Sequence, residues 1–195
     1  QEARRQRQMC IRDSYRDTLQ FLWDQTVRCA NKGLTLNETI NVIKLPRQFS
    51  DHYTTQQLYG LVEHHVRQIY TGLFGWFDED EANLFPVPLP ERSQRLVEGF
   101  GGKARVREII DASLTKNDFR WAIELSSWLV RGNLNDLGIA DAGELEDRNR
   151  LASALRGVAY TTSAANIRNW CITRALELDE TLNLSRFRKH RFSKR

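Results

Sequence analysis

Apolar side chains recur along this chain at intervals of three and four residues, which is the period of an α-helix with one buried face. The clearest run lies in residues 58–74, where the apolar positions are Leu58, Leu61, Val62, Val66, Ile69, Tyr70, Leu73 and Phe74. Gly75 follows this run, and glycine readily adopts the positive φ at which helices end. The pattern therefore predicts an amphipathic helix over residues 58–74.

Two large rings, Trp76 and Phe77, come directly after this helix, and an acidic, polar loop over residues 78–83 follows them. Aromatic side chains contribute more apolar area than other residues to cores and interfaces. Trp76 and Phe77 lie next to a polar loop and outside any helical stripe. We therefore expect them near the surface or against a partner.

A second helical stripe starts at Tyr15 and stops at Gly33. Thr35, with Glu38 three residues later, has the spacing of a capping box, which predicts a short helix that ends before Pro46. Two helices joined by a turn with glycine also form the outline of a helix-turn-helix. The second helix has one cation and one acid, whereas DNA recognition helices carry several Arg, Asn or Gln side chains, so DNA binding is the weaker alternative.

Three prolines, Pro86, Pro88 and Pro90, predict an extended connection and a possible boundary within residues 15–182. Helical patterns follow it near residues 93–100, 106–114, 121–129, 151–159 and 166–178. The pattern of alternating apolar positions typical of strands is missing throughout. The sequence therefore predicts an all-α fold, a helical bundle with tetratricopeptide-like antiparallel helix hairpins in its C-terminal half.

Several short motifs place the chain near a known family. They are Tyr59-Gly60, Tyr70, Gly75-Trp76-Phe77-Asp78 and Asn83-Leu84-Phe85-Pro86. Together with the segments on either side, over about residues 15 to 180, they resemble the alkyl sulfatase dimerisation domain. That domain is the all-helical middle section of zinc-dependent alkyl sulfatases of the metallo-β-lactamase superfamily. The chain departs from the family pattern around His64, which has Glu63 and His65 as neighbours, and again at residues 79–81.

The resemblance implies a homodimer in which this section forms the twofold interface and helps to close the substrate entrance. It implies that the complete enzyme is a sulfuric ester hydrolase that acts on alkyl sulfates with zinc as cofactor. We expect this chain to be a fragment without the N-terminal zinc hydrolase domain and the C-terminal sterol-carrier-like domain. The candidates for the interface or the substrate entrance are Tyr59, Gly60, His64, Tyr70, Trp76, Phe77, Asp78 and Asn83.

The residues that would make this chain a catalyst by itself are missing. The family's zinc site rests on a clustered H-x-H-x-D-H run, and this chain has only His52, His64, His65 and His190. Adjacent helical residues point about 100° apart, so His64 and His65 are poorly placed to bind one metal ion. Nucleophile-elbow and phosphate-loop motifs are absent as well. We therefore expect no catalytic residue, metal site or cofactor in this chain.

With 195 residues, 41% of them hydrophobic, the chain can bury one sizeable core. It lacks a run of about eighteen apolar residues, so no membrane span is expected, and its compartment stays open. Its three cysteines, Cys10, Cys29 and Cys171, are too few for a disulfide framework. We expect Cys29 and Cys171 to be buried in helices.

The net charge of +4 is concentrated at the two ends. Residues 183–195 carry +6 and residues 1–14 carry +2, which leaves −4 on the body. An acidic body argues against nucleic-acid binding. The basic tail is predicted to be disordered, with contact to anionic membranes or nucleic acid as the alternative. Residues 1–14 are interpreted as a non-native or disordered leader, because residues 9–14 look like one reading frame of a transposon end; an ordinary basic arm is the alternative.

One interpretation from another class remains open beside the dimerisation domain: a free-standing helical-hairpin module that binds a peptide or protein. Both accommodate the five tryptophans. We expect Trp23, Trp121, Trp128 and Trp170 in the core, because all four fall on helical stripes.

Overall fold

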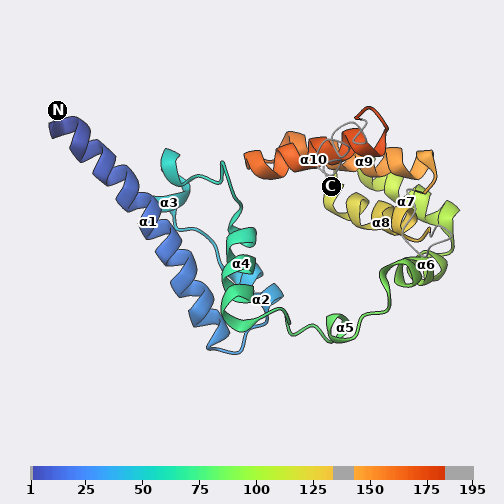
Figure 1. Cartoon of the computed structure of the whole chain (residues 1–195), viewed down its shortest axis with the longest axis horizontal. Coiled ribbons are helices and arrows are strands. Elements are labelled where there is room, and N and C mark those ends of the chain that lie inside the picture. Colours follow the sequence, from blue (N-terminus) through green and yellow to red (C-terminus); the bar gives the residue numbers. More distant parts are fainter. Residues whose placement is uncertain (1, 134–142, 183–195) are drawn as a thin grey trace, which may run out of the picture. The chain divides into compact units, whose positions relative to one another are not determined.

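Every regular element in the computed structural model is a helix, over the residues that it describes, 2–133 and 143–182 (Figure 1). The predicted all-α fold is therefore confirmed; the tetratricopeptide-like hairpins stay a prediction. The chain divides into two compact units, the first up to Pro86 with Ser163–Ala165, and the second from Val87 to Thr162 and again from Asn166. This division lies at the start of the proline-rich segment. The basic tail, 183–195, falls outside the described residues.

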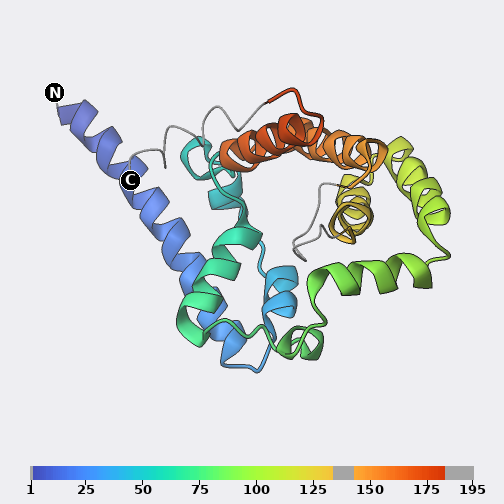
Figure 2. The same cartoon turned by 45° about the vertical axis from the view of Figure 1, so that its right-hand side comes forward.

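The first unit is built on one long helix with shorter helices packed against it. Its elements are α1 (Glu2–Ala30), α2 (Leu36–Val42), α3 (Arg47–Ser50), the 3-10 helix η1 (Tyr53–Thr55), α4 (Val62–Phe74) and α5 (Glu81–Leu84). In both views α2 and α4 lie beside the C-terminal half of α1 (Figures 1 and 2). The core between them consists of Leu22, Cys29, Ile43 and Val66.

Helix α1 is longer than its stripe predicts, because it begins at Glu2 and not at Tyr15. Residues 2–14, interpreted above as a leader, thus belong to this helix, and their origin stays a prediction. The helix ends where expected: Gly33 has a φ of 78°. The Thr35–Glu38 capping box at the start of α2 is confirmed, since each residue's side chain bonds the other's backbone N–H.

Helix α4 starts at Val62, so the prediction of a helix from Leu58 is wrong. The backbone groups just before Val62 form hydrogen bonds with partners outside the helix. The Gln57 side chain accepts a hydrogen bond from Val62 N at 2.8 Å, and the Leu58 carbonyl accepts one from Ala165 N at 2.8 Å. Ser163 Oγ donates to the Gln57 carbonyl at 2.8 Å as well. These bonds keep residues 57–61 out of the helix and fix Ser163–Ala165 in the first unit.

The second unit contains the remaining long helices. They are α6 (Leu89–Gly99), α7 (Lys103–Thr115), α8 (Phe119–Arg131), α9 (Leu145–Thr161) and α10 (Ala165–Leu178), which begins at the boundary. Helix α8 packs against α6, α7 and α9 over a core that includes Ile110, Leu125 and Leu129. The extended connection is shorter than predicted, because Pro88 caps α6 and Pro90 lies in its first turn, where a missing N–H costs nothing.

Ion pairs join α7 to α9. The Asp147 carboxylate, fully buried, accepts hydrogen bonds from Arg107 Nε at 2.7 Å and Arg107 Nη2 at 2.8 Å. Beside it, Arg150 donates two hydrogen bonds to Asp111 at 2.8 and 3.0 Å. A buried charge is tolerated only when it is paired in this way.

The expected tryptophan core is half right. Trp121 and Trp128 are partly buried, and both rings pack against Phe100. Trp23 and Trp170 are instead 46% and 63% exposed, although they too lie on helices. Cys29 and Cys171 are buried, as predicted.

Candidate functional site

The C-terminal end of α4 carries an exposed apolar surface. Phe74 is 48% exposed and packs at a tilt against the buried Tyr70, with ring centroids 5.0 Å apart. Gly75 then turns the chain with φ 95° and ψ −168°, a conformation open mainly to glycine. The turn brings the Trp76 ring, 72% exposed, against Phe77 at a centroid distance of 5.6 Å. Phe74 and Trp76, with the half-buried Phe77 beside them, form a solvent-facing aromatic surface at the end of α4.

The polar loop after these rings is held by its own side chains. Asn83 Nδ2 donates to Asp78 Oδ2 at 2.8 Å, and Asp78 Oδ1 accepts from Asp80 N at 3.2 Å. Asp80 in turn caps α5 through Ala82 N at 2.9 Å. Asp78 and Asn83, both candidates from the sequence, therefore stabilise the loop that follows the aromatic surface.

Tyr70 fastens this end of α4 to the rest of the first unit. Its hydroxyl donates to the Leu34 carbonyl at 3.3 Å, in the turn between α1 and α2. Burial, and after it the neighbouring carboxylates of Glu79 and Asp78, raise the pKa of Tyr70. A tyrosine hydroxyl is protonated at neutral pH in any case, and the raised pKa keeps this hydrogen-bond donor protonated to a higher pH.

The other three candidates lie at the opposite end of α4. Tyr59 is 80% exposed, and the exposed His64 lies 3.5 Å from Glu63 through Nε2. Gly60 packs so closely on His65 that an added Cβ would come within 2.6 Å of His65 Nε2. Burial, followed by the charge of His64, lowers the pKa of His65. Because α4 has 13 residues, it is about 20 Å long, and it separates Tyr59 and Gly60, before its start, from Trp76 and Phe77, after its end.

The described residues do not suit a zinc ion. Nowhere within 2–133 and 143–182 do three His, Cys, Asp or Glu side chains come together in a way that could hold a metal. His52 Nδ1 is engaged with the Thr54 hydroxyl at 2.8 Å. We therefore derive no catalytic step from this part of the chain. In the same residues, no helix is both long and apolar enough to span a bilayer.

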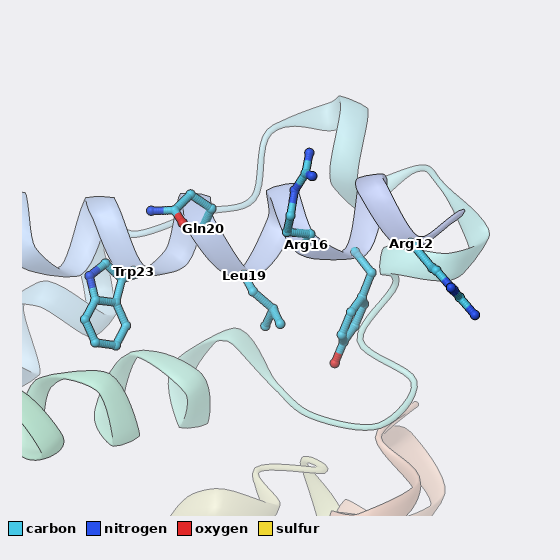
Figure 3. Close-up of a pocket in the computed structure, with 6 residues that line it drawn as sticks. Arg12, Arg16, Leu19, Gln20 and Trp23 are labelled. Carbon is cyan, nitrogen blue, oxygen red and sulfur yellow. The ribbon is translucent and has the colours of Figure 1, made fainter. Parts of the chain in front are cut away.

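A second exposed apolar surface, on α1, was missed by the sequence analysis. Its members follow one another at intervals of four residues: Ile11, Tyr15, Leu19 and Trp23, each 39–50% exposed. They run beside the buried row of Thr18, Leu22 and Thr26. The four-residue spacing could have revealed the exposed row. In the sequence pattern, however, the exposed and the buried row appear as a single apolar stripe. A shallow depression of about 420 Å³ lies along the exposed row (Figure 3).

Exposed apolar side chains are unevenly divided between the two units. Of nineteen large hydrophobic residues exposed in the described part of the chain, thirteen belong to the first unit and six to the second. A concentration of exposed apolar side chains is typical of interaction sites. The first unit is thus the part of the chain best suited to bind a partner.

Comparison with known proteins agrees with this picture. Residues 35–181 match the family model described as alkyl sulfatase dimerisation. A linear primary-alkylsulfatase of a Pseudomonas species is 37% identical over 169 residues, which is 86% of this chain and 30% of that enzyme. The alkyl/aryl-sulfatase BDS1 of Saccharomyces cerevisiae is 31% identical over 163 residues, 84% of this chain and 24% of that enzyme.

A solved structure is similar over nearly the same range. The stereoselective inverting sec-alkylsulfatase Pisa1 from Pseudomonas superposes with a TM-score of 0.77 and 31% identity, over 88% of this chain and 26% of that one. The chain therefore spans 24–30% of the length of these relatives.

Proposed function

The chain belongs to the alkyl sulfatase dimerisation family, and from this premise we propose that it pairs with a second copy of itself through the exposed apolar surface of its first unit. The observation that carries the proposal is the concentration of exposed apolar residues there, thirteen of nineteen. In a twofold interface each residue counts twice, so even a modest patch can hold a dimer. The aromatic surface at the end of α4 would contribute Phe74 and Trp76.

We further propose that the chain serves a larger sulfuric ester hydrolase. The relatives are named for hydrolysis of alkyl and aryl sulfates, and this chain spans 24–30% of their length. The family resemblance implies zinc for that chemistry, and the described residues hold no fitting ligand cluster. Zinc and its ligands would then lie outside the described residues of this chain.

A role at the substrate entrance is proposed for the same aromatic surface. An alkyl chain is apolar and flexible, and exposed rings such as Phe74 and Trp76 offer it contact area without hydrogen-bonding demands. In a dimer, the part of these rings that the partner leaves uncovered would face such a substrate. Tyr59 and His64 lie at the other end of α4 and are not included in this proposed entrance.

Dimerisation is tested by sedimentation velocity of the full chain across about a hundredfold concentration range. We expect a mass of twice 22.8 kDa at the upper end. Trp76→Ala should raise the dissociation constant about tenfold or more, since exposed aromatic anchors dominate interfaces. Trp170→Ala is the matched control: this ring is 63% exposed but belongs to the second unit, so its loss should leave the dimer unchanged. A wild type that remains monomeric throughout would refute the proposal.

A further inference from the structure

The ring of His65 lies directly against the backbone of Gly60. A Cβ added to Gly60 would come within 2.6 Å of Nε2 and 3.1 Å of Cε1 of this ring, so only a glycine leaves the ring its place. His65 is the fourth residue of α4 and is half-buried. The two residues therefore form a close contact between the first turn of α4 and the segment that precedes the helix.

We call residues 57–61 and Ser163–Ala165 the clasp, and Gly60 belongs to it. Its two halves are joined by hydrogen bonds that the Gln57 and Leu58 carbonyls accept, both at 2.8 Å. The first half also holds the start of α4, since the Gln57 side chain accepts a bond from the first helical N–H at 2.8 Å. Both halves belong to the first unit. A movement of Gly60 therefore acts on a joint between distant parts of the chain.

A positive charge on the His65 ring would have no counter-charge. Burial, followed by the charge of His64, opposes protonation of this ring and lowers its pKa. In the described part of the chain, no carboxylate of α1 or α2, the helices packed against α4, acts on it. Glu63 is nearby on α4, but its carboxylate approaches His64, at 3.5 Å. The clasp itself contains no Asp, Glu, Lys, Arg or His.

The position of His65 in its helix acts in the same direction. The first turn of an α-helix carries unpaired N–H groups and a partial positive charge, so a cation there is unfavourable. Burial against Gly60, the neighbouring His64 and the helix terminus thus all favour the neutral form of the His65 ring.

We propose that the clasp is a pH-sensitive device, closed while His65 is neutral and opened when its ring takes up a proton. The imidazolium requires water around it, so the ring turns away from Gly60 toward solvent. Gly60 then loses its cover, and the Gln57 and Leu58 carbonyls exchange their partners for water. This inference goes beyond the proposed dimerisation and does not depend on it.

The linkage between protonation and opening sets the pH range. The pKa of His65 in the closed clasp is below its ordinary value of 6.5, so the open form binds more protons between these two values. Falling pH therefore favours opening from about 6.5 downward, by at most about tenfold per pH unit for one proton. The effect levels off below the pKa of the closed form. The clasp is thus closed at neutral pH and opens in mild acid.

Hydrogen exchange of the full chain between pH 8 and pH 5 tests this device, with labelling times scaled to the intrinsic exchange rate at each pH. The reporting amides are Val62 and Ala165, which donate hydrogen bonds within the clasp. From pH 7 to pH 5 their protection should fall several-fold, and by no more than about thirtyfold, the limit for one proton below pH 6.5. Peptides of α8, in the core of the second unit, should change little.

Variants identify the titrating group. His65→Asn and His65→Gln keep a polar side chain that takes up no proton, so protection of the clasp should no longer depend on pH. His64→Asn is the matched control: it removes the adjacent exposed ring and leaves His65 against Gly60. Most of the pH dependence should remain in this control, because burial is the larger influence on His65.

Gly60→Ala tests the contact itself, because the added Cβ displaces the ring without removing it. The titration midpoint of the His65 ring, followed by NMR, should lie below 6.5 in wild type and closer to 6.5 in Gly60→Ala. Wild-type protection of the clasp that is the same at pH 8 and pH 5 overturns the proposal. A pH dependence that survives in both His65 variants, or a wild-type midpoint at or above 6.5, overturns it as well.

Discussion

At the scale of single residues, the clearest stabilising feature is the buried Asp147. Its carboxylate is fully enclosed, and Arg107, itself only 22% exposed, bonds both of its oxygens. The Asp147 hydrogen bond is the main cause that raises the pKa of Arg107. The two residues are 40 positions apart, on α7 and α9, so neither periodicity nor local motifs could reveal the pair. Sequence reasoning finds local partners and misses such distant ones.

Asp147→Ala should cost about 3–5 kcal/mol of unfolding free energy, because the change removes the fully buried partner of Arg107 and leaves it the half-exposed Glu144 at 2.7 Å. Glu146→Ala is the matched control: Glu146 precedes Asp147 and also approaches Arg150, but it is 60% exposed. Its loss should cost less than about 1 kcal/mol. Urea unfolding followed by circular dichroism measures both, and equal losses would contradict the expected difference.

A second residue, Asp179, predicts a dependence on pH. Its hydrogen bond from Arg156, followed by one from the Thr181 side chain, lowers the pKa of Asp179 from 3.8 to about 2. A carboxylate with a lower pKa in the folded state stabilises that state above the unfolded pKa, and the contribution is lost as the pH falls through the folded pKa. Asp179→Asn should therefore lower the thermal midpoint near pH 5 and make progressively less difference as the pH approaches about 2. If the difference in thermal midpoint between wild type and Asp179→Asn does not change with pH, the ionisation of Asp179 does not contribute to stability in this way.

At the scale of elements, the sequence predicted the glycines that end helices and the Thr35 cap well, but it predicted the starts of α1 and α4 and the exposed face of α1 poorly. The capping box at Thr35 and the glycines at 33 and 75 act through bonds and φ angles within a few residues, so the sequence contains their signal in full. Which side of α1 is covered depends on α2 and α4, and local spacing does not specify it. For this reason Trp23 was expected in the core and lies at the surface.

The candidate site was predictable to a similar extent. Trp76 was placed near the surface from its position after the helix, and it is 72% exposed. The start of α4 was wrong because Ala165, more than a hundred residues later, bonds the Leu58 carbonyl. Tyr59 and Gly60 consequently lie outside the helix. The sequence grouped all eight candidates into one segment, and the helix between them separates them in space.

Two glycines near the end of α4 should respond in opposite ways to alanine. An added Cβ meets no atom within 4 Å at Gly72 or at Gly75, so the two substitutions differ only in the backbone conformation at each position. Gly72 is inside the helix, and Gly72→Ala should stabilise the fold by about 0.5–1 kcal/mol. Gly75 has φ 95°, and Gly75→Ala should destabilise it by about 1–3 kcal/mol. Thermal unfolding of both variants checks the signs, and two shifts of the same sign would contradict the assignment.

At the scale of the whole molecule, each unit has a core of its own. Leu22 and Val66 belong to the core of the first unit, and Ile110 and Leu125 to that of the second. The long proline-rich segment that the sequence marked as a possible boundary lies at the division. Separate cores allow separate opening, since local stability follows the contacts within a cooperative unit.

Leu22→Ala and Leu125→Ala, both at almost fully buried positions, should each cost about 2–5 kcal/mol in their own unit. Hydrogen exchange of the full chain, read peptide by peptide, should show faster exchange in the first unit for Leu22→Ala and in the second for Leu125→Ala. Each variant is the control for the other. Faster exchange across both units from either change would mean that the chain unfolds as one.

The hydrogen bonds from Ser163 and Ala165 to residues 57 and 58 affect when the first unit can complete its folding during synthesis. During synthesis, residues 1–86 leave the ribosome first, but three residues of their unit are still untranslated. At about 5–20 residues per second, the intervening 76 residues, Val87 to Thr162, take roughly 4–15 s. During that interval the first unit exposes its apolar surface. The Gln57 and Leu58 carbonyls do not yet have the hydrogen bonds from Ser163 and Ala165. When the first unit receives its last piece, the second unit still lacks residues 166–195 and with them most of α10.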